Sequence, residues 1–185
     1  MNQQEAAEYL KRITRSINDY PKKGIIFRDL TTIFQDAKAM EMALDLLSEL
    51  LKNENSELIQ FDKLAGIEAR GFLIAGALSG RLGGGVVMMR KPGKLPYKKK
   101  RMNYQLEYGK DALEVHVDAI SPGDKIIVVD DLLATGGTAE AGCKLVEELG
   151  GTVVQVLFLV ELPDLNGRVK LANYNVKSVI SFEGK

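Results

Sequence analysis

The sequence predicts an α/β domain of three layers, in which helices flank a mainly parallel central sheet. Two observations lead to this prediction. Several short runs, such as residues 124–132 (DKIIVVDDL) and 152–161 (TVVQVLFLVE), are apolar at consecutive positions, as strands buried on both faces are. Segments of helical length separate these runs, and that alternation is typical of parallel strands joined by helical crossovers. Ligands of such sheets bind at the carboxyl ends of the strands.

The elements follow in order along the chain. Residues 5–17 carry apolar side chains at helical spacing and predict an amphipathic helix that stops at the turn DYPKKG. Residues 37–51 predict a second helix by the same spacing. The later elements are a strand at 63–69, a helix at 72–82 after Gly71, strands at 84–91, 112–120 and 124–132, a helix at 138–150 closed by Gly150, and strands at 152–161 and 176–182. The polar stretch 92–111 has few core-forming residues.

The composition limits the class of protein. A chain of 185 residues fits one domain, expected to span residues 1–185. Its 25 basic and 25 acidic residues balance, so we expect neither nucleic acid nor a membrane surface as a partner. One cysteine, Cys143, excludes an internal disulfide and favours a reducing compartment. The longest apolar run is too short to span a membrane, and the charged N-terminus is unlike a signal peptide. We therefore expect a cytoplasmic protein.

The segment 125–142, KIIVVDDLLATGGTAEAG, contains the clearest chemical signal. Its two adjacent glycines let the backbone turn tightly and approach a ligand. The helix that follows offers free N–H groups and the positive end of its dipole, and both favour a phosphate. The G-x-x-x-x-G-K-[ST] pattern of a nucleoside-triphosphate loop is absent, so the segment suits one terminal phosphate better than three.

Two carboxylates, Asp130 and Asp131, precede this phosphate loop. Carboxylates accept hydrogen bonds from paired sugar hydroxyls, and they also hold Mg²⁺ directly or through water. The alternative is a surface loop with capping residues. Adjacent acids at the end of a buried apolar run are difficult to explain as packing, so we prefer a ribose-phosphate site.

The sequence VVDDLLATGGT closely resembles the phosphoribosyl-pyrophosphate (PRPP) signature of the type I phosphoribosyltransferases. In that family the two acids bind the ribose 2′ and 3′ hydroxyls and the ATGGT loop binds the 5′-phosphate. By resemblance the first role falls on Asp130 and Asp131. The second falls on Ala134, Thr135, Gly136, Gly137 and Thr138. The resemblance also implies the type I fold, a flexible hood loop at residues 95–110, and a homodimer.

Four further segments resemble the members of this family that use adenine: DYPKKGIIFRDLTTIF, GIEARGF, RKPGKLP and YQLEYGKDALEVHVDAI. The implied reaction is a pentosyl transfer of purine salvage, in which adenine and PRPP give AMP and pyrophosphate. Mg²⁺ is implied as the cofactor, bound mainly through PRPP and pyrophosphate and not by dedicated protein ligands. Two alternatives stay open: transfer to another purine such as xanthine or guanine, and a PRPP-sensing regulator without catalysis.

The resemblance assigns the remaining site residues. Adenine binding falls on the N-terminal segment at about 1–35, where Phe27 stacks on the base and the backbone of Ile26 and Arg28 reads its edge, while Leu132 closes the other side. Pyrophosphate, which leaves with much negative charge, falls to basic groups. These are Arg70, Arg90, Lys91 and Lys94.

One catalytic candidate lies in the hood. The resemblance assigns Glu107 to the proton of the base, exchanged or stabilised near N7. The hood departs from the family pattern in its basic run YKKKRMNY, residues 97–104. This run would attract PRPP, contact another partner, or form a solvated loop tip, and the sequence leaves all three open.

Overall fold

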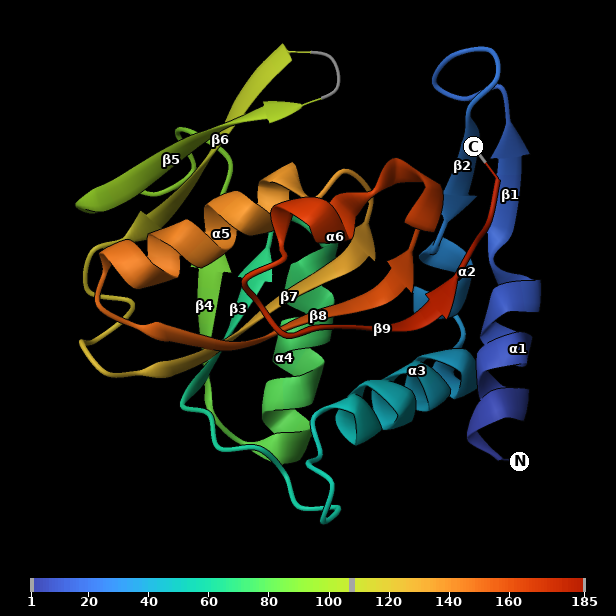
Figure 1. Cartoon of the computed structure of the whole chain (residues 1–185), viewed down its shortest axis with the longest axis horizontal. Coiled ribbons are helices and arrows are strands. Elements are labelled where there is room, and N and C mark those ends of the chain that lie inside the picture. Colours follow the sequence, from blue (N-terminus) through green and yellow to red (C-terminus); the bar gives the residue numbers. More distant parts are fainter. Residues whose placement is uncertain (1, 107–108, 185) are drawn as a thin grey trace.

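A five-stranded parallel sheet forms the centre of the molecule (Figure 1). The computed structural model describes residues 2–106 and 109–184. Across the sheet the strands are β4 (Gly85–Met89), β3 (Lys63–Ile67), β7 (Lys125–Leu133), β8 (Thr152–Glu161) and β9 (Val176–Ser181). All four neighbouring pairs are parallel. The prediction of a mainly parallel sheet is confirmed.

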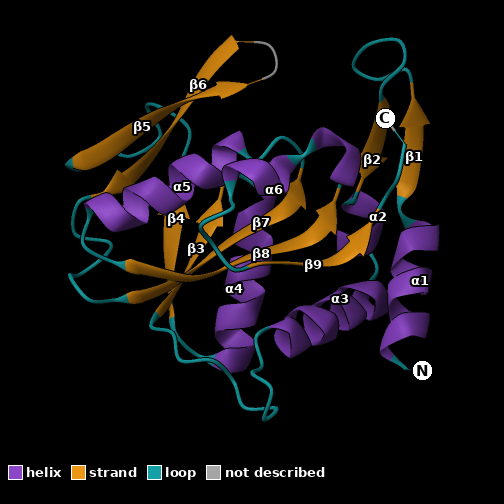
Figure 2. Cartoon of the chain, in the orientation of Figure 1, coloured by secondary structure: helices purple, strands orange, loops and turns teal. Residues whose placement is uncertain are grey.

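Helices cover both faces of this sheet (Figure 2). One face carries α1 (Gln3–Ile13), α3 (Ala37–Leu50) and α4 (Arg70–Leu82), and the other carries α5 (Gly137–Glu148) and the short α6 (Gly167–Lys170). Strand alternation divides the core accordingly. Ile127 and Val129 of β7 pack in the cluster beneath α3 and α4, whereas Ile126 and Val128 pack in the cluster beneath α5. Both faces of the central strands are therefore buried, as their apolar sequences predict.

The N-terminal helix is shorter than predicted, and a hairpin follows it. α1 ends at Ile13, because Thr14 is extended and its hydroxyl caps the helix by donating to the Leu10 carbonyl at 2.8 Å. Strand β1 (Arg15–Asn18) then pairs antiparallel with β2 (Ile26–Asp29), which sets Ile17 opposite Phe27. Ile17 continues the helical spacing of the sequence but faces a cross-strand partner. The turn predicted between them is present. It is followed by α2 (Thr31–Phe34).

The segment expected to form a hood loop is largely a β-hairpin. Strand β5 (Lys99–Leu106) pairs antiparallel with β6 (Gly109–His116), and we call these two strands the hood hairpin. The strand predicted at 112–120 therefore begins and ends earlier. Met102 and Tyr104 alternate with polar neighbours and pack in the cluster beneath α5, as side chains on one face of a strand do. The neighbouring lysines make this alternation difficult to recognise in the sequence.

Connecting elements complete the chain. A short 3₁₀ helix, η1 (Pro163–Leu165), joins β8 to α6. Within the described ranges, no helix has the length and apolar character needed to cross a membrane.

Candidate active site

The carboxyl end of β7 delivers two acids beside the N-terminus of α4. Four buried residues precede Asp130, which is half-buried, and Asp131, which is only 4% exposed. The helix approaches this end closely because residue 71 is glycine. A Cβ on Gly71 would lie 2.7 Å from the Val129 carbonyl and 3.2 Å from Asp130 Oδ1. This approach sets Arg70, the first residue of α4, in an ion pair with Asp131, with Nε 2.5 Å from Oδ2.

The two acids interact with each other. Burial raises the pKa of Asp130 well above its usual range, and the charge of Asp131 raises it further. Burial also raises the pKa of Asp131, although the Arg70 guanidinium opposes this. The backbone N–H of Asp131 donates to Asp130 Oδ1 at 2.9 Å. Two ionised carboxylates so close together, and removed from water, lower the stability of the folded protein. They can, however, bind hydroxyl donors or a cation, and such perturbed groups are common at functional sites.

The phosphate loop, residues 134–138, has a backbone that only glycine permits. Gly136 has φ of +79°, and a Cβ there would lie 2.4 Å from the carbonyl oxygen of Gly167. Gly167 is equally constrained, because its Cβ would lie 2.3 Å from the Ala134 carbonyl oxygen. The loop therefore rests directly on the start of α6. The loop leads directly into α5, with Gly136 as its N-cap. The first N–H groups of a helix have no partner within the helix, and they favour an anion.

An ion pair anchors α6 under the loop. Arg168 binds Glu161 through two contacts of 2.7 Å and donates to the Val176 carbonyl at 3.0 Å. Glu161 is 7% exposed at the end of β8, and hydrogen bonds from Arg168 hold its pKa below the usual range. Bidentate arginine–carboxylate pairs combine strength with fixed geometry. The support of the phosphate loop is thus fixed to β8 and β9.

Two neighbouring cavities occupy this end of the sheet. The larger, of about 370 Å³, is lined by Ile67, Glu68, Ala69, Arg70, Lys91, Asp130, Asp131, Leu132 and Thr138. The smaller, of about 130 Å³, is lined by Asp130, Phe158 and residues 132–139. They share Asp130, Leu132 and Thr138. A larger open hollow of about 800 Å³ lies at α1 and α3, and two of the cations that line it, Arg81 and Lys52, pair with Asp45 and Glu49.

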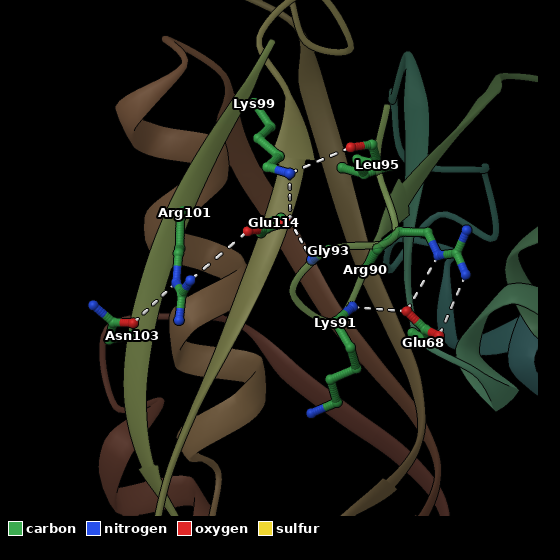
Figure 3. Close-up of polar contacts among 9 residues, drawn as sticks. All are labelled: Glu68, Arg90, Lys91, Gly93, Leu95, Lys99, Arg101, Asn103 and Glu114. Atoms are coloured by element: carbon green, nitrogen blue, oxygen red, sulfur yellow. Dashed lines mark hydrogen bonds and ion pairs between the residues drawn. The ribbon is translucent and has the colours of Figure 1, made fainter. Parts of the chain in front are cut away.

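Glu68 binds the first two residues of the basic segment after β4, Arg90 and Lys91 (Figure 3). The Glu68 carboxylate accepts from Arg90 Nε at 3.2 Å and from the backbone N–H of Lys91 at 2.7 Å. The Arg90 hydrogen bond lowers the pKa of Glu68. Figure 3 shows the Lys91 side chain directed away from Glu68, and this residue lines the larger cavity. Lys94 is exposed, and neither cavity includes it.

Buried Glu114 of β6 fixes the base of the hood hairpin to this segment. Its carboxylate, 3% exposed, accepts from the backbone N–H of Gly93 at 3.0 Å and pairs with Lys99 at 3.3 Å and Arg101 at 4.0 Å. Lys100 pairs with Glu148 of α5 at 3.0 Å. Lys99, Lys100 and Arg101 therefore contact carboxylates of the surrounding structure, and Figure 3 shows Lys99 and Arg101 at Glu114. We interpret the run as an anchor of the hairpin.

The segment assigned to adenine lies on β2, outside the lining of both cavities. Ile26, Phe27 and Arg28 lie on β2, with the Phe27 ring edge-to-face on Tyr20 at 5.3 Å. Neither cavity is lined by residues 26–28, whereas Leu132 lines both. The end of β2 is nonetheless close to the site. Hydrogen bonds from Thr31 lower the pKa of Asp29, and the charges of Arg15 and Arg70 lower it further.

The structure thus brings together most of the residues that the sequence proposes. The two acids, the phosphate loop, Arg70, Lys91 and Leu132 surround the two cavities. Glu107 lies outside the described residues. Sequence reasoning missed Glu68, Glu114 and Gly167. Glu68 stands inside the quoted segment GIEARGF, and this position was its only signal.

Comparisons with known proteins point to one family. The profile of the phosphoribosyl transferase domain matches residues 32–184. An adenine phosphoribosyltransferase of Bradyrhizobium sp. (strain ORS 278) is 49% identical over 177 residues, which cover 95% of this chain and 96% of that protein. The crystal structure of adenine phosphoribosyltransferase from Thermoanaerobacter pseudethanolicus superposes with a TM-score of 0.90, at 48% identity over 95% of this chain and 99% of that one.

A further solved structure carries ligands. The adenine phosphoribosyltransferase of Saccharomyces cerevisiae, complexed with adenine and an imino-altritol bisphosphate, has a TM-score of 0.89 and 36% identity. The match covers 95% of this chain and 99% of that one.

Proposed function

Because the chain belongs to the phosphoribosyltransferase family and, within it, to the adenine phosphoribosyltransferases, we propose how its residues divide the work of the transfer. The reaction joins adenine to the phosphoribosyl group of PRPP and gives AMP and pyrophosphate. One observation carries the assignment of the site: the two acids at the end of β7 share a pair of adjoining cavities with a glycine-dependent phosphate loop. The solved yeast relative, which holds adenine and a bisphosphate, is in keeping with such a site.

PRPP lies across both cavities in this proposal. The smaller cavity, bounded by the loop from Ala134 to Thr138, takes the 5′-phosphate, because backbone N–H groups at a helix N-terminus favour that charge. Asp130 and Asp131 then accept from the ribose hydroxyls. Hydrogen bonds from the ribose hydroxyls replace the hydrogen bonds to water that the two carboxylates lose on burial.

The larger cavity takes the pyrophosphate. Arg70 and Lys91 line it and carry the positive charge that the leaving group needs. Arg90 and Lys94 belong to the same basic segment and complete the set, with Arg90 oriented by Glu68 and able to serve a neighbouring subunit. Arg70 pairs with Asp131, so it is held beside the ribose end as well.

Adenine lies between the β1–β2 hairpin and β7. Phe27 stacks on the base, the backbone of Ile26 and Arg28 reads its edge, and Leu132 covers the other face. Phe27 is only half-buried and packs on Tyr20, so its ring offers a surface to a ligand. The proton of the base falls to Glu107.

Mg²⁺ fits this donor set as a companion of the substrate. Within the part of the chain that the structure describes, no group of three or more His, Cys, Asp or Glu side chains is placed to hold a metal. Mg²⁺ commonly binds through one or two carboxylates together with substrate phosphates. Asp130 and Asp131 supply such carboxylates, and the ion would neutralise charge on the leaving pyrophosphate.

The setting of the enzyme is also a proposal. We infer a cytoplasmic homodimer in which residues 1–185 act as one domain, with residues 95–110 closing over the site, and with neither nucleic acid nor membrane as a partner. Exposed apolar side chains on α4 and β4, Leu73, Val86 and Met88, favour a surface that a second copy covers. The balanced charge supports the absence of a nucleic-acid partner.

The function is tested by incubating the protein with PRPP, Mg²⁺ and each nucleobase in turn, and by following nucleotide formation chromatographically. We expect AMP from adenine, and little product from guanine, xanthine or hypoxanthine. Nucleotide from another purine but not from adenine would show that the base is wrong. PRPP binding without product from any base would instead favour the regulator.

Replacing Glu107 with Gln is expected to lower kcat by about a hundredfold, the scale of a lost general acid–base group. The KM for adenine and for PRPP should change much less, because the amide keeps the size of the side chain. Steady-state kinetics of Glu107→Gln and of Glu54→Gln, an exposed control in the loop after α3, measure this. Equal kcat in the two variants would rule out the proton role.

A further inference from the structure

We propose that Asp111 and Tyr104 are positioning residues for Lys91, and that through this ammonium group the hood hairpin is coupled to the pyrophosphate end of the site. The inference rests on the proposed role of Lys91 in pyrophosphate binding. Asp111 lies on β6 and Tyr104 on β5, whereas Lys91 follows β4. The contact therefore joins the hairpin to the wall of the larger cavity.

Both hairpin residues contact the Lys91 ammonium. Nζ lies 2.6 Å from Tyr104 Oη and forms a close ion pair with Asp111 Oδ2. The Tyr104 hydroxyl also lies within hydrogen-bond distance of Asp111 Oδ2, at 3.1 Å, so the three groups form a closed cluster. Nζ stands 5.3 Å from the centre of the Tyr104 ring, a distance typical of a cation–π contact.

The strand register makes this pair a single unit. Tyr104 and Asp111 are directly opposite each other across β5 and β6, and such cross-strand neighbours present their side chains on the same face. Tyr104 is 8% exposed and packs in the core cluster beneath α5. The other Asp111 oxygen accepts from the backbone N–H of Ala112 at 2.7 Å. Packing and hydrogen bonds therefore hold both groups in place on the hairpin.

Lys91 is held at its other end as well. Its backbone N–H donates to Glu68, so the main chain and the end of the side chain are both fixed. An ammonium group has three N–H donors. Tyr104 and Asp111 engage two, which leaves one for a ligand oxygen in the cavity that Lys91 shares with Arg70, Asp130 and Asp131.

Electrostatics keep the cluster charged. Burial alone would lower the pKa of Lys91, but the hydrogen bonds of Asp111 and Tyr104 outweigh it and the pKa is raised. Burial would likewise raise the pKa of Asp111, but Lys91 and the Ala112 N–H bring it below its usual range. Lys91 is therefore a cation whose remaining donor is directed by the hairpin.

Coupling of this kind is reciprocal. A pyrophosphate oxygen bound to Lys91 gains from a hairpin that holds the ammonium still, so its binding steadies the hairpin in return. An alternative is competition, in which the anion draws Lys91 away from Asp111. The two arrangements predict opposite effects of removing the Asp111 carboxylate.

The test compares Lys91→Gln, Asp111→Asn, Asp111→Glu and Tyr104→Phe with Asp118→Asn, an exposed control just beyond β6. Steady-state kinetics give KM for PRPP and for adenine, and calorimetry with Mg²⁺-pyrophosphate gives its Kd. We expect Asp111→Asn to raise both the KM for PRPP and the Kd about 5- to 20-fold, in the lower part of the range for coupling between two sites, because the ammonium itself is kept. The KM for adenine should stay within about twofold of the control. Tyr104→Phe should show a smaller effect of the same kind, and Asp111→Glu should recover part of the loss.

The double variant Lys91→Gln/Asp111→Asn separates positioning from general damage. If Asp111 acts through Lys91, the double variant binds pyrophosphate no more weakly than Lys91→Gln alone. Additive losses, unchanged binding in both Asp111→Asn and Tyr104→Phe, or tighter binding in Asp111→Asn would each overturn the inference.

A separate result tests the function on which the inference rests. Unchanged pyrophosphate and PRPP binding in Lys91→Gln would remove Lys91 from the proposed site. Weakened binding in Lys91→Gln, with no effect of the hairpin variants, would keep that role and reject the positioning residues. Hydrogen exchange gives a second readout: pyrophosphate should slow exchange of the β5 and β6 amides in the unmodified protein and not in Lys91→Gln. Equal slowing in both would contradict the coupling.

Discussion

Gly136→Ala is expected to raise the KM for PRPP about a hundredfold or more, with a much smaller effect on the KM for adenine. Gly136 has φ of +79°, which costs a residue with a Cβ roughly 1–2 kcal/mol. The new Cβ would also lie 2.4 Å from the Gly167 carbonyl oxygen. Because this contact is with backbone, relief requires the loop itself to move. A displacement of about 1 Å in a binding group is sufficient for a loss of this size.

The backbone of Gly167, which Gly136 contacts, is held firmly in place. Arg168, next to Gly167, is bound twice to buried Glu161 and once to the Val176 carbonyl. The start of α6 is therefore fixed to two strands of the sheet. Adding the clash to the backbone strain, we expect Gly136→Ala to lose about 3 kcal/mol of unfolding free energy, at the upper end of common substitutions.

A matched control separates strain from clash. Gly123 has φ of +90°, and a Cβ there would meet nothing within 4 Å. Gly123→Ala should thus lose only the backbone term, about 1 kcal/mol, and keep the kinetics of the unmodified protein. Denaturant unfolding and PRPP kinetics of both variants are the measurements. Equal KM values for PRPP in the two variants would show that the packing of the loop on α6 does not matter for binding.

The fold was predictable where burial fixes the pattern. The strand predicted at 152–161 agrees with β8 at both ends, because a strand covered on both faces is apolar throughout. The hairpin of β1 and β2 was not predictable in the same way. Ile13 and Ile17 keep a helical spacing, and only the pairing of Ile17 with Phe27, ten residues further on, selects the strand. The local sequence pattern does not indicate that a strand ten residues away will pair with Ile17.

The same distinction applies to the site. Asp130, Asp131 and the phosphate loop come from one strand–loop–helix unit, so a short motif was enough to propose them. The residues that orient them come from remote parts of the chain. Gly167 touches the loop because α6 folds back on β7, and Asp111 meets Lys91 because the hood hairpin crosses to the cavity wall. Neither contact leaves a signal in spacing, since each depends on how separate elements pack.

Asp130→Asn is expected to make the protein more stable at pH 7.5 and to weaken PRPP binding at the same time. Burial and the Asp131 charge hold the pKa of Asp130 well above its usual range in the folded protein. The folded state therefore binds this proton more tightly than the unfolded state. The stabilisation from the protonated acid is fully present below the unfolded pKa, about 3.9, and is lost as the pH rises through the folded pKa. At pH 7.5 the unfolded chain carries this acid ionised, so folding must either bury the charge or take up a proton, a cost that Asn does not carry.

The expected gain at pH 7.5 is about 1 kcal/mol, or roughly 2–4 °C in Tm for a chain of this length. It should shrink towards zero near pH 4, where Asp130 is protonated in the folded state and increasingly so in the unfolded one. PRPP affinity should fall about 10- to 100-fold, because a carboxylate that accepts from ribose hydroxyls becomes an amide that offers two donors. Thermal unfolding at several pH values and PRPP kinetics measure the two effects.

Asp131→Asn provides the comparison that ranks the two acids. It should weaken PRPP binding on a similar scale, but its gain in stability should be smaller or absent, because Arg70 loses the carboxylate 2.5 Å from its Nε. Asp118→Asn, exposed and remote from the cavities, should change neither quantity. The idea tested is that the acids at the end of β7 lower stability and strengthen PRPP binding. A lower Tm for Asp130→Asn at pH 7.5, or unchanged PRPP affinity in both variants, would contradict it. The stabilities of the two variants should differ most where both acids are ionised, since only there does Arg70 distinguish them.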